Sequence, residues 1–192
     1  MSYTPKTIDE VVTEYLNRFT FLPAIQREFV WDTYSIEKLF DSILGDYPIG
    51  TFLFWKITEE HKNDWAAYEF IRDFESDNPH NKEANLSGIN KDIYMVLDGQ
   101  QRLTALYIGL KGSYKYIYRK KMYKTKLFIN ILKKPLSNED PEEFLYQFKF
   151  KENDSIDLND PSPQFWYLVG DILNFDDAED AKRSIKKKLN CL

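Results

Sequence analysis

Residues 93–106 read Ile93-Tyr94-Met95-Val96-Leu97-Asp98-Gly99-Gln100-Gln101-Arg102-Leu103-Thr104-Ala105-Leu106. The first five residues are apolar, which indicates a buried strand. From Leu103 onward the apolar residues recur at helical spacing, at positions 103, 106, 107 and 110, which predicts a helix. The five polar residues 98–102 therefore form a turn that leads from a strand into a helix.

A turn of this kind can bind an anion, because the first amide groups of a helix have no backbone partner and the helix dipole adds positive potential. Gly99 permits a tight turn or the close approach of a ligand, and Arg102 supplies a guanidinium suited to phosphate oxygens. Asp98 could hold a magnesium ion or position a water molecule. Gln100 and Gln101 could orient a nucleophile. The structural alternative is that Asp98 only caps the helix and Arg102 points to solvent.

A second polar segment lies upstream, at Pro23-Ala24-Ile25-Gln26-Arg27. It lies between an extended piece and a helix, so that Gln26 and Arg27 could form a second wall of the same site. The alternative is that Arg27 pairs with a surface carboxylate and that Trp31 belongs to the core.

Composition excludes several classes of protein. With 43% hydrophobic and 16% aromatic residues among 192, the chain can bury a core, so we expect one ordered domain. The histidines are His61 and His80, both in a polar stretch, and the one cysteine is Cys191. This leaves almost no material for Cys/His zinc sites, histidine-dependent triads or an internal disulfide. No apolar run approaches the ~20 residues that span a bilayer, so we expect a cytoplasmic protein with no membrane partner.

The net charge of -5 hides a strongly basic segment. Residues 111–134 carry nine Lys or Arg and no acidic residue, whereas residues 135–180 carry two basic and thirteen acidic residues, 2 − 13 = −11. Within the basic segment, residues 114–118 and 126–132 are predicted strands of a hairpin, and tyrosines alternate with cations. Lysines on phosphates would suit DNA, with Arg119, Lys120, Lys121 and Lys124 as the contacts. A solvated hairpin whose lysines prevent edge-to-edge aggregation is the alternative.

The remaining pattern predicts a helix that begins with a capping box at Thr7 and Glu10, a helix over 36–44 and a strand over 50–57. Residues 59–92 are polar and lack a long period, so we interpret them as an excursion from a single domain that covers residues 1–192. A short ordered piece is expected around residues 65–71.

Four motifs occur in order along the chain: Pro23-x-x-Gln26-Arg27-x-x-x-Trp31, Ile36-x-x-Leu39-x-x-Ser42-Ile43, Tyr47-Pro48-Ile49-Gly50, and Leu97-Asp98-Gly99-Gln100-Gln101-Arg102-Leu103-Thr104-Ala105-Leu106. Together they resemble the N-terminal, ParB-like domain of the GmrSD-type modification-dependent restriction proteins and their relatives in bacterial phage defence. The resemblance is close over about residues 5–135 and looser beyond.

The resemblance implies an α+β fold similar to ParB and sulfiredoxin, a small mixed sheet flanked by helices. It also implies binding and hydrolysis of a nucleoside triphosphate with Mg²⁺, which would regulate DNA restriction. Carried over by position, the catalytic residues would be Asp98, Gln100 and Arg102, with Asp98 also as the metal ligand. The nucleotide-binding residues would be Gln26, Arg27, Gly99, Gln101 and Thr104.

In this family a separate nuclease domain of the HNH type does the cutting. The chain lacks the histidines of such a domain, so we expect it to be the N-terminal part of a longer protein or a stand-alone member, with the nuclease on the same or another chain. DNA cleavage by this part alone is not expected. The alternative function is a non-enzymatic DNA-binding or assembly module in which residues 98–102 are only a structural turn.

Overall fold

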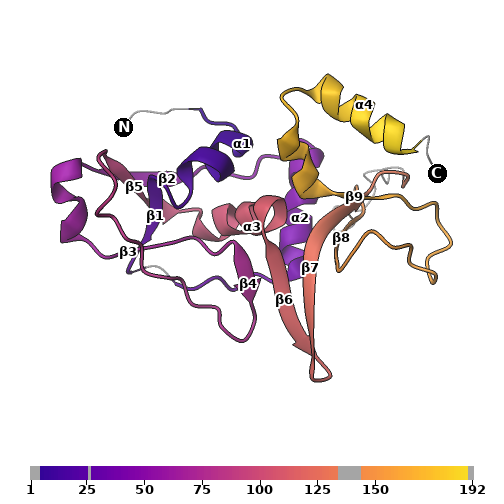
Figure 1. Ribbon diagram of the computed structural model, residues 1–192, viewed down its shortest axis with the longest axis horizontal. Helices are drawn as coiled ribbons and strands as arrows, with labels where there is room; N and C mark the ends of the chain where they lie inside the picture. The colour runs from indigo at the N-terminus through magenta and orange to yellow at the C-terminus, as the bar shows by residue number, and fades with distance from the viewer. Residues whose placement is uncertain (1–4, 26, 134–143, 190–192) are drawn as a thin grey trace.

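The computed structural model describes residues 5–25, 27–133 and 144–189 and confirms the α+β class, with two mixed sheets flanked by helices (Figure 1). The strands are β1 (Thr20–Pro23), β2 (Leu53–Ile57), β3 (Ala67–Tyr68), β4 (Asp73–Glu75), β5 (Ile93–Asp98), β6 (Ser113–Tyr118), β7 (Lys121–Asn130), β8 (Phe148–Lys151) and β9 (Trp166–Leu168). The helices are α1 (Ile8–Glu10), which continues as the π-helical η1 (Val11–Tyr15), α2 (Thr33–Leu44), the 3₁₀ turn η2 (Glu59–Asp64), α3 (Gln100–Lys111), the 3₁₀ turn η3 (Val169–Asn174) and α4 (Ala178–Leu189).

The first sheet has the strand order β2-β5-β1-β3. Its central strand β5 runs parallel to β1 and antiparallel to β2. The strand that precedes the polar turn is thus held on both sides by hydrogen-bonded neighbours, and Ile93, Met95 and Val96 are fully buried. This fixes the position at which the chain leaves the sheet and enters α3.

The second sheet has the order β4-β6-β7-β8, and β9 also pairs with β7. The predicted hairpin is confirmed as β6 and β7, with β7 beginning at Lys121, earlier than the pattern indicated. Strand β4 pairs in parallel with β6.

Helix α3 lies between the two sheets in Figure 1 and contacts α2, η1, η3, β6 and β7. Leu103 and Leu106 of the predicted stripe are buried, but so are Ala105 and Ile108 on other sides of the helix. A helix surrounded by other elements loses the clean polar face of a surface helix. Its polar first turn is consequently buried as well.

The predicted capping box is confirmed, because the Thr7 side chain accepts from the Glu10 amide and the Glu10 carboxylate accepts from the Thr7 amide. Helix α2 ends at Leu44, as the pattern predicts, but it begins at Thr33, three residues before the predicted range, after an Asp32 cap. Within the described ranges, no helix is long and apolar enough to cross a membrane.

Residues 59–92 contribute one strand to each sheet: β3 pairs with β1, and β4 pairs with β6. Strand β3 falls within the ordered piece expected near 65–71, whereas β4 was not predicted. Leu86 from the same segment packs in a second small core with Phe21, Ile57, Ala67, Ile93 and Met95. This segment therefore covers one face of the first sheet.

Two carboxylates of α2 hold the β8 segment. Asp41 accepts a hydrogen bond from the Tyr146 amide at 2.7 Å, and Glu37 accepts one from the Phe150 amide at 2.9 Å. Burial raises the pKa of Glu37 to about 7, against the hydrogen bond from Phe150 and the charge of Lys149, which lower it.

This buried carboxyl makes the free energy of unfolding depend on pH. The unfolded chain loses the Glu37 proton near pH 4.5, whereas the folded protein keeps it to about pH 7. The resulting stabilisation is fully present below pH 4.5 and is lost as the pH rises through 7, an effect on the order of 3 kcal/mol. The variant Glu37→Gln keeps a hydrogen-bond acceptor but cannot ionise. We expect its free energy of unfolding, measured in urea at pH 5, 6, 7 and 8, to decline less with rising pH than that of wild type. Parallel plots of the free energy of unfolding against pH for wild type and variant would contradict this. The matched control is Glu14→Gln, at an exposed position.

Candidate functional site

The polar turn between β5 and α3 depends on Gly99. Its φ of +89° is in the left-handed region, and a Cβ atom there would lie 2.4 Å from Cδ1 of Phe52. Gly99 is the N-cap of α3, and no side chain caps the helix there. The first intrahelical hydrogen bond is donated by the Leu103 amide to the Gly99 carbonyl, at 3.0 Å. The structural alternative in which Asp98 caps the helix is therefore wrong.

The two glutamines bind the segment Arg27–Val30. Gln101 donates from Nε2 to the Glu28 carbonyl at 2.9 Å and accepts from the Val30 amide at 3.0 Å, so its side chain pairs with the segment as a neighbouring strand would. Gln100 donates to the Arg27 carbonyl. Both glutamine side chains are buried. The structure thus brings the backbone of residues 27–30 against the first turn of α3. The expectation that Gln26 and Arg27 form a second wall of a binding site stays a prediction.

Arg102 is held on the other side of the turn. Its Nη1 donates to the Ile49 carbonyl at 2.5 Å, and its guanidinium lies over the Phe52 ring, 4.8 Å from the centroid. A Cβ atom at Gly50, whose φ is +83°, would lie 2.6 Å from Nη1. The Arg102 side chain is 20% exposed. Arg102 is therefore a positioned guanidinium with limited access to solvent, and the expectation that it simply points outward is wrong.

Asp98 presents the exposed carboxylate of the site. Its side chain is 69% exposed, and Oδ2 lies 3.4 Å from Nη2 of Arg102. A long ion pair at an exposed carboxylate contributes little to stability. Asp98 is thus available to a ligand beside a fixed cation.

The other predicted nucleotide contacts are placed as follows. Arg27 is exposed, next to the turn, and Gln26 lies outside the described residues. Thr104 is 1% exposed, and its hydroxyl has no hydrogen-bond partner among the described residues. It lies on the buried side of α3 rather than at the mouth of the turn.

The predicted DNA contacts lie far from this turn. Arg119 and Lys120 form the β6–β7 turn, and Lys121 and Lys124 follow in β7. Helix α3 separates them from Asp98, since its 12 residues span ~18 Å at 1.5 Å per residue. The structure therefore contains two separate polar regions, at opposite ends of the α3–β6 unit.

The residues that could hold a metal are few. In the parts of the chain that are described, no group of three or more His, Cys, Asp and Glu side chains is close enough to hold an ion. One exposed carboxylate fits the way in which Mg²⁺ usually binds with a nucleotide, since that ion takes one or two carboxylates and completes its shell with phosphate and water.

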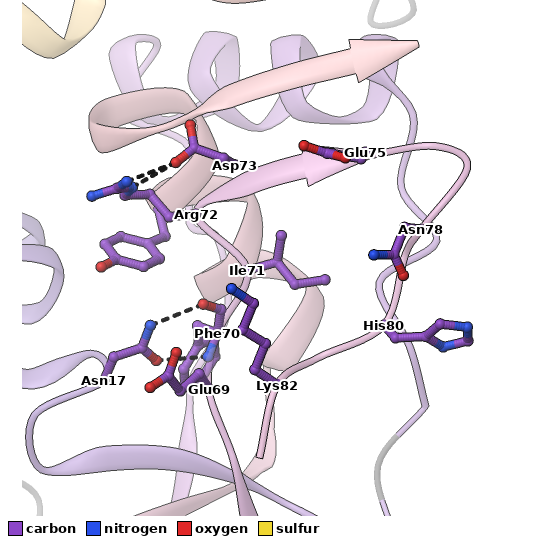
Figure 2. A pocket seen from close by; sticks show the side chains of 11 residues that line it. Asn17, Glu69, Phe70, Ile71, Arg72, Asp73, Glu75, Asn78, His80 and Lys82 are labelled. Atoms are coloured by element: carbon purple, nitrogen blue, oxygen red, sulfur yellow. Dashed lines mark hydrogen bonds and ion pairs between the residues drawn. The ribbon is translucent and has the colours of Figure 1, made fainter. Parts of the chain in front are cut away.

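A pocket of about 650 Å³ lies beside the second half of α3 and was not predicted (Figure 2). It is lined by charges of both signs, including Glu69, Asp73, Arg72 and Lys82, with Tyr107 from α3. Arg72 and Asp73 pair at 2.8 Å. His80 on its rim pairs with Glu28, whose carbonyl is bound by Gln101. Residues 27–30 therefore contact both the turn and one residue of the pocket lining, His80.

Sequence reasoning also missed the partners of Arg102. Ile49 and Gly50 belong to a quoted motif, but nothing in their local pattern indicates that a backbone carbonyl would bind an arginine 53 residues away. The positive φ at position 50 explains why a glycine occurs there. The glycine does not by itself indicate that Arg102 contacts this segment.

These features define a mixed α+β domain in which an Asp-Gly-Gln-Gln-Arg turn joins a central strand to a buried helix and is enclosed by two upstream segments. The chain belongs to the family described as GmrSD restriction endonuclease, N-terminal domain, whose model matches residues 8–192. It therefore corresponds to the N-terminal domain of this family of restriction endonucleases. An uncharacterised protein of Methanocaldococcus jannaschii is 36% identical over 110 residues, which make up 57% of this chain and 18% of that protein's own length.

Proposed function

We propose that this chain is a nucleotide-binding, NTP-hydrolysing regulatory domain of a DNA restriction system, with the nucleotide phosphates at the N-terminal end of α3. The observation that supports it is the combination at one turn: a helix start without a capping side chain, a positioned guanidinium and an exposed carboxylate. Each of these attracts phosphate or its metal.

The first-turn amides of Gln100, Gln101 and Arg102 precede the first intrahelical bond at Leu103, so they can donate to phosphate oxygens. Arg102 would add charge to these donors. Its contacts with Ile49 and Phe52 hold the guanidinium in place, which reduces the conformational entropy lost on binding. Gln100 and Gln101 would act by holding Arg27 and its neighbours against the turn.

Hydrolysis of a phosphoanhydride depends mainly on positioning and charge neutralisation, so a site without histidine is chemically adequate. Mg²⁺ bound with the nucleotide would supply charge neutralisation at the phosphate oxygens. Asp98 is the residue of this chain that would hold the ion or position the attacking water. An HNH-type nuclease on the same or another chain would be the partner that this domain regulates.

The competing function is a DNA-binding or assembly module with no nucleotide site. The observation that favours it is that Gln100, Gln101 and Arg102 all donate to backbone carbonyls of this chain. These bonds are compatible with either function, because a ligand site also needs a rigid frame.

Isothermal titration of ATP, GTP, CTP and UTP, each with Mg²⁺, separates the two. We expect one nucleotide to bind at micromolar strength and Arg102→Ala to weaken it by roughly 10- to 100-fold, the effect of losing a charge-assisted hydrogen bond. Arg119→Ala, which removes an equal charge at the far hairpin, is expected to bind as wild type. Asp98→Asn is expected to lose hydrolysis of the nucleotide, measured as the release of inorganic phosphate. Failure of all four nucleotides to bind, or full binding by a folded Arg102→Ala, would favour the module without a nucleotide site.

A further inference from the structure

The β6–β7 hairpin continues beyond the sheet that carries it. Strand β4 pairs with β6 only as far as Lys115, and β8 pairs with β7 only from Lys126 onward. Residues 116–123 therefore pair only with each other, and Lys124 pairs with Lys115. Residues 116–124 pair with no third strand of the described chain and project away from the rest of the protein (Figure 1). We refer to residues 116–124 as the arm.

The tip of the arm has an unfavourable backbone conformation for its residues. Arg119 and Lys120 have φ values of +49° and +65°, which is the pattern of a two-residue I′ turn. Asn-Gly or Asp-Gly is favoured there, and a left-handed residue with a Cβ costs roughly 1 to 2 kcal/mol. Arg119 and Lys120 are thus less favourable for folding in this turn than Asn-Gly or Asp-Gly would be. Their presence points to a role for the two cationic side chains themselves.

The charge of the arm is of one sign. It carries Arg119, Lys120, Lys121 and Lys124, and no acidic residue occurs between positions 111 and 134. The nearest paired carboxylate, Glu75, contacts Lys115 at the base of the arm. Lys124, at the base of the arm, lies close enough to Asp73 to lower the pKa of that carboxyl. Arg119, Lys120 and Lys121 form no ion pair with another described residue, and projecting cations of this kind are complementary to a polyanion.

The tyrosines of the arm are arranged to support these cations. The rings of Tyr116 and Tyr123 stack on each other with centroids 5.4 Å apart and planes 13° apart. Lys121 lies over the Tyr123 ring at 4.8 Å, and Arg119 lies over the Tyr118 ring at 5.1 Å. At least one face of each ring is already occupied, which leaves less ring surface on which unpaired bases could stack. The rings instead hold the cations extended, which suits contacts with phosphates on a rigid duplex.

We propose that the arm binds double-stranded DNA by entering its major groove. The four residues from Tyr116 to the turn reach ~13 Å at about 3.4 Å per residue, and the groove is about 12 Å wide and 8.5 Å deep and admits a two-stranded ribbon. Ile117 and Met122, which are directly opposite each other and 51% and 54% exposed, form an apolar pair on the other face. Such side chains can contact thymine methyl groups on the groove floor. The arm and the nucleotide site are separate, so either can fail without the other.

The test replaces the tip by the favoured turn, Arg119→Asn with Lys120→Gly. This variant is expected to fold at least as stably as wild type, because Asn-Gly adopts the I′ turn without strain. Binding of a fluorescein-labelled 20-base-pair DNA duplex, followed by anisotropy at several salt concentrations, should weaken at least tenfold. The slope of log Kd against log salt should fall by about 2, for two lost phosphate contacts.

The control variant, Lys38→Gln with Lys186→Gln, removes the same charge from two exposed positions outside the arm, and is expected to bind within threefold of wild type. The proposal is overturned if wild type fails to bind the duplex, or if the tip variant binds like the control. It is also overturned if the single strand, or a duplex RNA with its narrow major groove, binds as tightly as the DNA duplex.

Discussion

Gly112→Ala is expected to unfold or strongly destabilise this protein, by about 3 kcal/mol or more. Gly112 lies where α3 ends and β6 begins, alongside the start of β4. A Cβ atom there would be 1.8 Å from the Arg72 carbonyl oxygen, which itself accepts from the Ser113 amide. Backbone cannot move aside as a flexible side chain can, so the added methyl must separate β4 from β6. We expect the melting temperature to fall by roughly 6 to 12 °C, measured by circular dichroism.

Gly88→Ala is the matched control for this variant. A Cβ atom at Gly88 would meet nothing within 4 Å, so its effect should stay within about 0.5 kcal/mol. If Gly112→Ala melted at the temperature of Gly88→Ala, the close approach of the two segments would be contradicted.

Gln101→Leu is expected to lose about 2 to 4 kcal/mol and to release the segment Arg27–Val30. Leucine fills a similar volume but leaves the Glu28 carbonyl and the Val30 amide without their partner, and each unpaired group costs about 1 to 3 kcal/mol. Hydrogen exchange of the Val30 amide is the measurement, because its acceptor is the side chain that has been removed. Exchange of that amide should accelerate at least tenfold, while the amides of β5 keep their protection.

Gln100→Leu provides a graded comparison, since the Gln100 side chain makes one hydrogen bond to the segment where the Gln101 side chain makes two. We expect its effect on stability to be about half as large. Unchanged protection of Val30 in Gln101→Leu would contradict the role assigned to the glutamines.

The local elements of this fold are predictable from sequence. The strand, the polar turn and α3 are predicted because a run of apolar residues before Asp98 is followed by apolar residues at helical spacing. The capping box is predicted because Thr7 is followed three residues later by Glu10. The hairpin follows from alternation on either side of Arg119 and Lys120. In each case the determining interactions lie within a few residues along the chain.

The contacts that build the site are of another kind. Gln101 and Val30 are 71 residues apart, and Arg102 and Ile49 are 53 apart. Both contacts join a side chain to a backbone group, and every residue carries a backbone amide or carbonyl, so residue identity at Val30 or Ile49 gives no signal. Strand β4, with three residues, is too short for a period to be recognised, and the pocket that it borders was missed with it.

The central claim, that nucleotide phosphates bind at the first turn of α3, is tested most directly by locating the bound nucleotide in ¹⁵N-labelled protein by NMR. We expect saturation with the nucleotide and Mg²⁺ to shift the amide resonances of Gly50 and of Gly99, Gln100, Gln101 and Arg102 most. Amide protons that donate to phosphate should move downfield. If the largest shifts fall instead on residues 69–82, the nucleotide occupies the charged pocket of Figure 2 and the account given for the turn is wrong.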